Sequence, residues 1–182
     1  QLLAAYWLRG AKDPMMDELY QKLLKRLYTL YANIAIHRHL QNSTFLHGIY
    51  TTVRSSGKRW SLDALRQEME GFVSDVAMLE LEPQHVRKEK SQELFQQHRQ
   101  QMNALFNYVV TARIWTDGIG QGMEELLLLP TIDSMDQQLL VSAITLSLMN
   151  CFDVVKFRTL VNVCQQSDDE AVRQRALVGW RS

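Results

Sequence analysis

Apolar residues recur at intervals of three and four positions along most of the chain, which is the spacing of one face of an α-helix. The longest such pattern begins after Asp13-Pro14, a pair typical of a helix start, and continues to about residue 40. Because its apolar face is broad, we expect this face, including the tyrosines at 20, 28 and 31, to pack in the protein core. The face carries Met15, Met16, Leu19, Tyr20, Leu23, Leu24, Leu27, Tyr28, Leu30, Tyr31 and Ile34.

Three further helical patterns precede residue 118. Polar residues at 41–44 separate the first pattern from the second, which ends at a Ser-Ser-Gly break at 55–57, and this predicts two helices or one interrupted helix. Ser61 opens a third pattern that ends before Pro83, and Pro83 then provides the first turn of a long helix to about Trp115. We interpret the glycines that follow as a flexible connector between the two halves of the chain: Gly118, Gly120 and Gly122.

The last third of the chain contains an internal repeat. Ser134-Met135-Asp136-Gln137 has the form of a capping box, in which Ser and Gln side chains satisfy free backbone N–H groups at a helix start. Ser167-Asp168-Asp169-Glu170 repeats this form 33 positions later, and Asp153 begins another helix between the two copies. Helix, turn, helix and repeat is the pattern of a stacked α-solenoid. The residues that define the repeat are Ser134, Asp136, Ala143, Asp153, Ser167, Asp169, Val172, Arg173 and Ala176.

The stretch from Ser134 to Trp180 resembles HEAT or armadillo-type repeats, above all at Asp169, Val172, Arg173 and Ala176. Repeats of that family commonly begin with an Asp, followed by a Val-Arg pair and a packed Ala. Leu140 takes the place of Arg173 in the first copy, so the family's usual polar contact between repeats lacks its arginine there. The resemblance implies a scaffold that binds other proteins and implies no enzyme activity, although some relatives bind nucleic acid.

Composition agrees with a helical chain, because 8 Gly and 3 Pro among 182 residues are too few for a many-turned β-sandwich. We predict an all-α fold, an α-solenoid-like stack of antiparallel helix pairs. Residues 1–117 are expected to form a less regular helical region, basic at its start, and residues 118–182 HEAT-like repeats, the last of them truncated. Stacked repeats leave their end faces open, so we expect a fragment of a larger protein that can self-associate through exposed repeat ends.

No arrangement of residues predicts a metal, cofactor or catalytic site. His37 and His39 are two positions apart on a helix and point in different directions, so we expect surface histidines. Cys151 and Cys164 lie in apolar helical patterns, which predicts buried free thiols and a reducing compartment. No apolar run is long enough to cross a bilayer, so we predict a cytoplasmic protein.

Charge is unevenly distributed, although 20 basic residues balance 20 acidic ones. Residues 1–60 carry nine basic residues against three acidic ones, a net +6 that the remaining residues balance with −6. One interpretation is a surface for an acidic protein, a phosphate-bearing ligand or nucleic acid. The other, which we favour because the basic residues are dispersed, is that this charge faces the acidic second half or acidic segments of a longer protein outside this sequence. The candidate binding residues are Lys22, Lys25, Arg26, Arg38, Arg54, Lys58 and Arg59.

These observations together predict a non-catalytic protein–protein interaction scaffold. The alternative is a helical module that binds nucleic acid or a phosphate-bearing ligand through the basic residues between 19 and 62, a stretch without Asp or Glu. An enzyme with its site between the two halves is the third class, and it ranks last because no acid, base or nucleophile cluster is visible.

Overall fold

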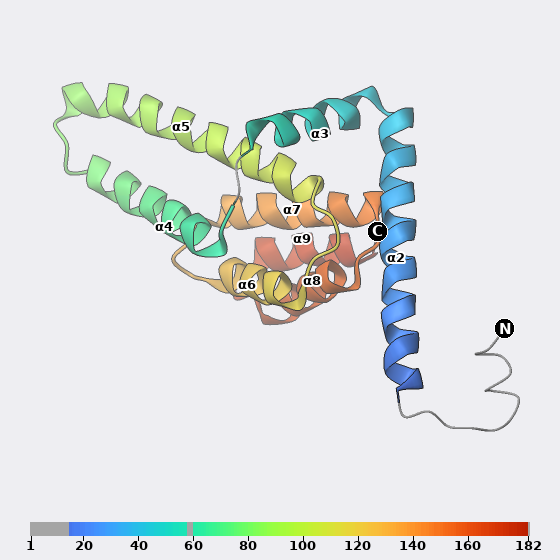
Figure 1. Cartoon of the computed structure of the whole chain (residues 1–182). Coiled ribbons are helices and arrows are strands. Elements are labelled where there is room, and N and C mark those ends of the chain that lie inside the picture. Colours follow the sequence, from blue (N-terminus) through green and yellow to red (C-terminus); the bar gives the residue numbers. More distant parts are fainter. Residues whose placement is uncertain (1–14, 58–59, 182) are drawn as a thin grey trace, which may run out of the picture.

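A computed structural model describes residues 15–57 and 60–181 of the chain, with side chains described up to Gly179 in the last helix (Figure 1). Eight α-helices form in this part of the chain, several of them begun by a side-chain cap, such as Ser61 accepting from the Ala64 N–H at 3.1 Å. The helices are α2 (Met16–Asn42), α3 (Thr44–Ser56), α4 (Leu62–Leu79), α5 (Gln84–Val110), α6 (Asp117–Leu128), α7 (Ser134–Asn150), α8 (Val154–Gln166) and α9 (Glu170–Arg181).

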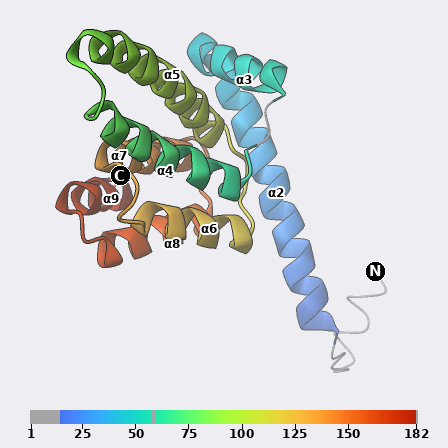
Figure 2. The same ribbon diagram turned by 90° about the vertical axis from the view of Figure 1, so that its left-hand side faces the viewer.

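Helices α4 to α9 form a two-layered stack of three successive hairpins (Figures 1 and 2). One layer contains α4, α6 and α8, and the other contains α5, α7 and α9, so each helix packs on the helix two places along the chain. The predicted all-α stack of antiparallel helix pairs is therefore confirmed. The α4–α5 hairpin belongs to the same two layers, although the sequence repeat does not extend to it.

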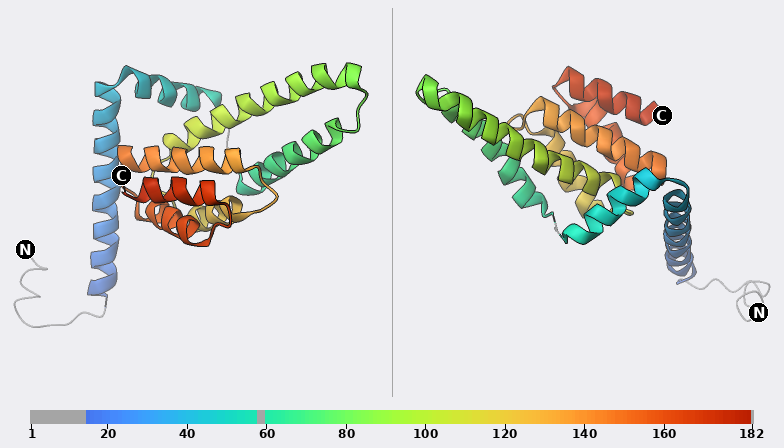
Figure 3. Two further views of the ribbon diagram at one scale, coloured as in Figure 1. Left: turned by 180° about the vertical axis from the view of Figure 1, so that it is seen from behind. Right: turned by 90° about the horizontal axis from the view of Figure 1, so that it is seen from above.

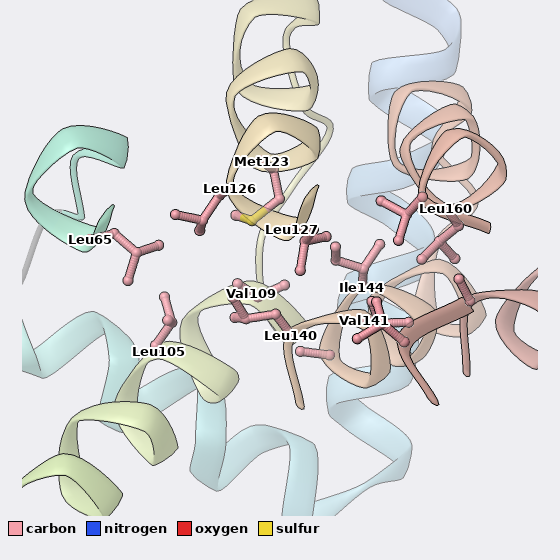
Figure 4. Close-up of a cluster of buried hydrophobic side chains, with 14 of the residues drawn as sticks. Leu65, Leu105, Val109, Met123, Leu126, Leu127, Leu140, Val141, Ile144 and Leu160 are labelled. Carbon is pink, nitrogen blue, oxygen red and sulfur yellow. The ribbon is translucent and has the colours of Figure 1, made fainter. Parts of the chain in front are cut away.

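The hydrophobic core lies between the two layers of this stack (Figure 4). Leu65 of α4 and Leu105 of α5 belong to the same buried cluster as Leu127 of α6, Leu140 of α7 and Leu160 of α8. The cluster therefore continues across residue 117, where we placed the boundary between two regions. The division into two regions stays a prediction.

The starts of α7 and α9 correct the predicted capping boxes. Asp133, not Ser134, caps α7, because its carboxylate accepts from the Met135 N–H at 2.9 Å. At α9 the Asp169 carboxylate accepts from the N–H groups of Ala171 and Val172. The two caps are 36 positions apart rather than 33. The first cap lies one position before the predicted one and the second lies two positions after it, so the two errors add to three residues, nearly one helical turn. The predicted start of α8 at Asp153 is confirmed.

The glycines after residue 117 lie inside helix α6, so their interpretation as a flexible connector was wrong. A Cβ at Gly120 would lie 2.3 Å from Val155 Cγ1 of α8, and one at Gly122 would lie 2.3 Å from Leu62 Cδ1 of α4. Both neighbours belong to the same layer as α6. These glycines therefore allow three helices to approach closely, which a side chain would prevent.

Candidate interaction surface

Helix α2 runs along one edge of the molecule, beside the stack (Figures 1 and 3). It packs against α3 and against α7, and its first half extends away from the other helices (Figure 2). Ala32 is the one buried residue of this helix. A small side chain at this position lets the α2 backbone approach the stack, but it contributes little apolar contact area.

The apolar face of α2 points into solvent, so the prediction that it packs in the core was wrong. Nine of its eleven large side chains are 45–66% exposed, the tyrosines at 20, 28 and 31 among them, and Met16 and Leu24 are half-buried. At 3.6 residues per turn, Leu23, Leu27, Leu30 and Ile34 share one side of the helix and Ala32 lies on the opposite side. We call this surface the outer face of α2, and it consists of Leu19, Tyr20, Leu23, Leu27, Tyr28, Leu30, Tyr31 and Ile34.

The candidate anion-binding residues lie on α2 and α3 as far as the structure describes them. Lys22, Lys25, Arg26 and Arg38 belong to α2 and Arg54 to α3, whereas Lys58 and Arg59 lie outside the described residues. Lys22 forms an exposed ion pair with Glu18 at 2.6 Å, within the same helix. No other ion pair involves these five residues in the described part of the chain, so the acidic half does not pair with them there.

A buried lysine that sequence reasoning missed holds the loop between α5 and α6. The Lys156 ammonium of α8 donates to the carbonyls of Ala112 and Arg113 at 2.7 and 2.9 Å and to the Ser147 hydroxyl at 2.9 Å. Burial lowers the pKa of Lys156 to about 8, partly offset by the carboxylate of Asp153. Because all three N–H groups of the ammonium are engaged, Lys156 acts as a clamp on this loop. The loop begins at Thr111, so α5 ends earlier than predicted.

A second buried polar contact joins α4, α5 and α7. The His98 imidazole stacks on the Phe72 ring, with centroids 3.5 Å apart, and its Nε2 lies 3.0 and 2.8 Å from the two Asp136 carboxylate oxygens. One N–H can donate to only one of these oxygens, so the other lacks a donor. Burial raises the pKa of Asp136, and the hydrogen bond and charge of His98 partly offset this effect. Asp136 is a buried acceptor between helices rather than part of a cap.

A half-open apolar pocket of about 360 Å³ lies between α3, α4, α5 and α6. Trp60, Tyr108 and Trp115 contribute aromatic walls, and among the described lining residues Arg113 contributes the one charged group. Neither Lys156 nor the His98–Asp136 pair lines it. The groups with shifted pKa values therefore do not face this pocket.

The remaining chemistry of the described residues is sparse. His37 and His39 are exposed as predicted, and His37 contacts Gln41 one turn later at 3.2 Å. Cys151 and Cys164 are unpaired and half-buried. Within the described ranges no group of three or more His, Cys, Asp or Glu side chains could hold a metal ion, and none of the described helices has the length and apolar character that crossing a bilayer requires. Comparison of the chain with protein-family models, with curated proteins and with solved structures finds no match.

Proposed function

We propose that this chain is a non-catalytic interaction module that binds another protein through the outer face of α2. The observation that carries the proposal is the direction of this face, because eight large apolar side chains point away from the stack. At roughly 200 Å² for a large side chain, exposures of 45–66% leave on the order of 900 Å² of their surface in water. Monomeric proteins rarely expose apolar patches above about 300–600 Å², and larger patches mark interaction sites.

The stacked helices support this role as a scaffold. The resemblance of the stretch around Asp169, Val172 and Ala176 to HEAT or armadillo-type repeats implies protein binding, and the two-layered packing is compatible with it. The buried clamp at Lys156 and the stacked pair at His98 add polar contacts that hold helices in fixed positions. A rigid base of this kind lets α2 present its face without losing much conformational entropy on binding.

A photoreactive amino acid in place of Leu27 tests the proposal. Irradiation in an extract of the source cells is expected to crosslink a defined protein, identified by mass spectrometry, because Leu27 lies in the middle of the outer face. The matched control carries the same photoreactive group at Gln97, an exposed position of α5. Leu23→Asp is expected to remove the crosslink at position 27. Equal crosslinking from positions 27 and 97, or none from position 27, would contradict the proposal.

The second candidate is binding of an anionic partner by the basic residues of α2 and α3. It is favoured by one observation, that Arg26, Arg38 and Arg54 form no ion pair within the described residues. Binding of a labelled single-stranded oligonucleotide that weakens steeply with salt, and that is lost when Arg54, Lys58 and Arg59 are changed to Glu, would support it. Binding that is unaffected by salt would exclude a phosphate contact.

A further inference from the structure

We propose that the outer face of α2 pairs with the α2 helix of a second copy of this chain, with the two helices antiparallel. This inference rests on the proposed function and names the partner. The apolar positions of α2 alternate at intervals of four and three residues, which is the spacing of the a and d positions of a coiled coil. They are Met16, Tyr20, Leu23, Leu27, Leu30 and Ile34, followed by the polar His37 and Gln41.

The way α2 is attached to the stack leaves this seam free. In the same heptad frame Ala32 occupies an f position, which is directly opposite the a and d positions. Ala32 is the residue that α2 buries against its own chain. The attachment and the seam therefore lie on opposite sides of one helix, and a second helix can approach without displacing α3 or α7.

Charge favours the antiparallel orientation. Antiparallel pairing that sets Leu27 opposite Leu30 of the second copy also sets Leu23 opposite Ile34 and Tyr20 opposite His37. Asp17 of the acidic first turn then lies beside Arg38 of the second copy, near the opposite end of the helix, because both occupy e positions beside the seam. Arg26, at a g position beside the seam, lies level with the uncharged Tyr31 of the second copy. A parallel pair would instead set Arg26 level with Arg26 of the second copy, where like charges repel.

The available area agrees with a stable dimer. Specific interfaces bury about 800 Å² per partner, and the outer face without Tyr28, which occupies a b position, offers roughly 800 Å² of exposed apolar side chain. The helix has 27 residues, about 40 Å at 1.5 Å per residue, which is enough for nearly four heptads. Two apolar helices in this arrangement would remove exposed leucine and tyrosine side chains of the outer face from water.

Sedimentation equilibrium of the chain tests the proposal directly. The wild-type chain is expected to be a dimer, and Leu27→Glu is expected to weaken dimerisation by about 100-fold or more, because two leucines per dimer lose their burial. Leu30→Lys is expected to act likewise. Lys25→Glu is the control, since Lys25 occupies an f position and lies outside the seam. Circular dichroism is expected to stay unchanged in all three variants, because the three side chains are exposed in a single chain.

Mixing the two disruptive variants tests the orientation. In an antiparallel pair, Glu at position 27 of one copy faces Lys at position 30 of the other, while the second central layer keeps two leucines, so a heterodimer is expected to form. In a parallel pair these positions never face each other, and mixing restores nothing. Dimers of each single variant, or a mixture that stays monomeric, would overturn the proposal. A monomeric wild-type chain that still crosslinks another protein from position 27 would overturn self-pairing alone and leave the proposed function intact.

Discussion

In α7, the side chains of Leu140, Val141, Ala143 and Ile144 are fully buried, whereas in α2 the leucines at 23, 27 and 30 are 57–61% exposed. Both helices place apolar residues at helical spacing. The difference lies in their neighbours, because α7 packs against α5, α6, α8 and α9, and α2 packs against α3 and part of α7. An amphipathic pattern therefore tells which side of a helix is apolar but not what covers that side.

The largest difference in the free energy of unfolding is expected between an alanine substitution in α7 and one in α2. Ile144→Ala is expected to lower the free energy of unfolding by about 2–5 kcal/mol, because it leaves a cavity among residues that cannot collapse to fill it. Leu27→Ala is expected to change it by less than about 0.5 kcal/mol in the monomer, since this side chain stays mostly in water. Urea unfolding at a protein concentration low enough to keep the chain monomeric measures both values. Equal decreases in the free energy of unfolding would show that α2 is covered within one chain.

A smaller decrease in the free energy of unfolding is expected when the buried lysine is replaced. No described residue of α2 makes a comparable buried contact. Lys156→Met keeps the length of the side chain but leaves the carbonyls of Ala112 and Arg113 without their donor. We expect a decrease of about 1–3 kcal/mol in the free energy of unfolding at pH 7, because buried acceptors without a partner are unfavourable.

The difference in free energy of unfolding between the wild type and Lys156→Met is expected to depend on pH. The pKa of Lys156 is about 8 in the folded chain against 10.5 for an ordinary lysine, so the unfolded state binds more protons between these values. The free energy of unfolding of the wild type should therefore rise with pH above 8, by at most about 1.4 kcal/mol per unit, relative to Lys156→Met. A difference between the two proteins that stays constant from pH 7 to 9.5 would contradict a lowered pKa.

Two glycines distinguish close packing from open surface in the same way. Gly120→Ala is expected to destabilise the chain by about 1–3 kcal/mol, since its Cβ would lie 2.3 Å from Val155 Cγ1. Gly48→Ala, in the middle of α3, meets no atom within 4 Å and is expected to stabilise the chain by about 0.5–1 kcal/mol through higher helix propensity. Thermal unfolding of both variants measures the contrast, and the same sign for both would contradict the packing of α6 on α8.

Local patterns predicted the helices and part of their ends, since Ser61, Asp153 and the glycine after Ser56 lie where cap chemistry requires them. The capping boxes failed because each start offers two good caps, Asp133 and Ser134 before α7 and Ser167 and Asp169 before α9, and the sequence pattern does not choose between them. The sequence pattern did not predict contacts between residues of different helices. Gly120 looked like a connector because its role depends on Val155, a residue of another helix.

The interaction surface was partly visible in the sequence. The spacing of Leu23, Leu27, Leu30 and Ile34 predicted one apolar face, and only the packing of α2 shows that this face is exposed. Lys156 carried a weak signal, because a charged residue between Val155 and Leu160 interrupts an apolar helical pattern. Its partners, the carbonyls of a loop that precedes it by more than forty residues, follow from tertiary structure alone.

The smallest effects are expected from surface ion pairs, which occur in both regions. Lys22 pairs with Glu18 within α2 at 2.6 Å, and Arg158 of α8 pairs with Asp117 of α6 at the same distance. All four side chains are exposed, so Lys22→Ala and Arg158→Ala are each expected to lower the free energy of unfolding by no more than about 0.5–1 kcal/mol, and by less at 1 M salt. Urea unfolding at low and high salt measures this. A loss above 2 kcal/mol for Arg158→Ala alone would mean that charge, in addition to apolar burial, holds the stack together more firmly than α2.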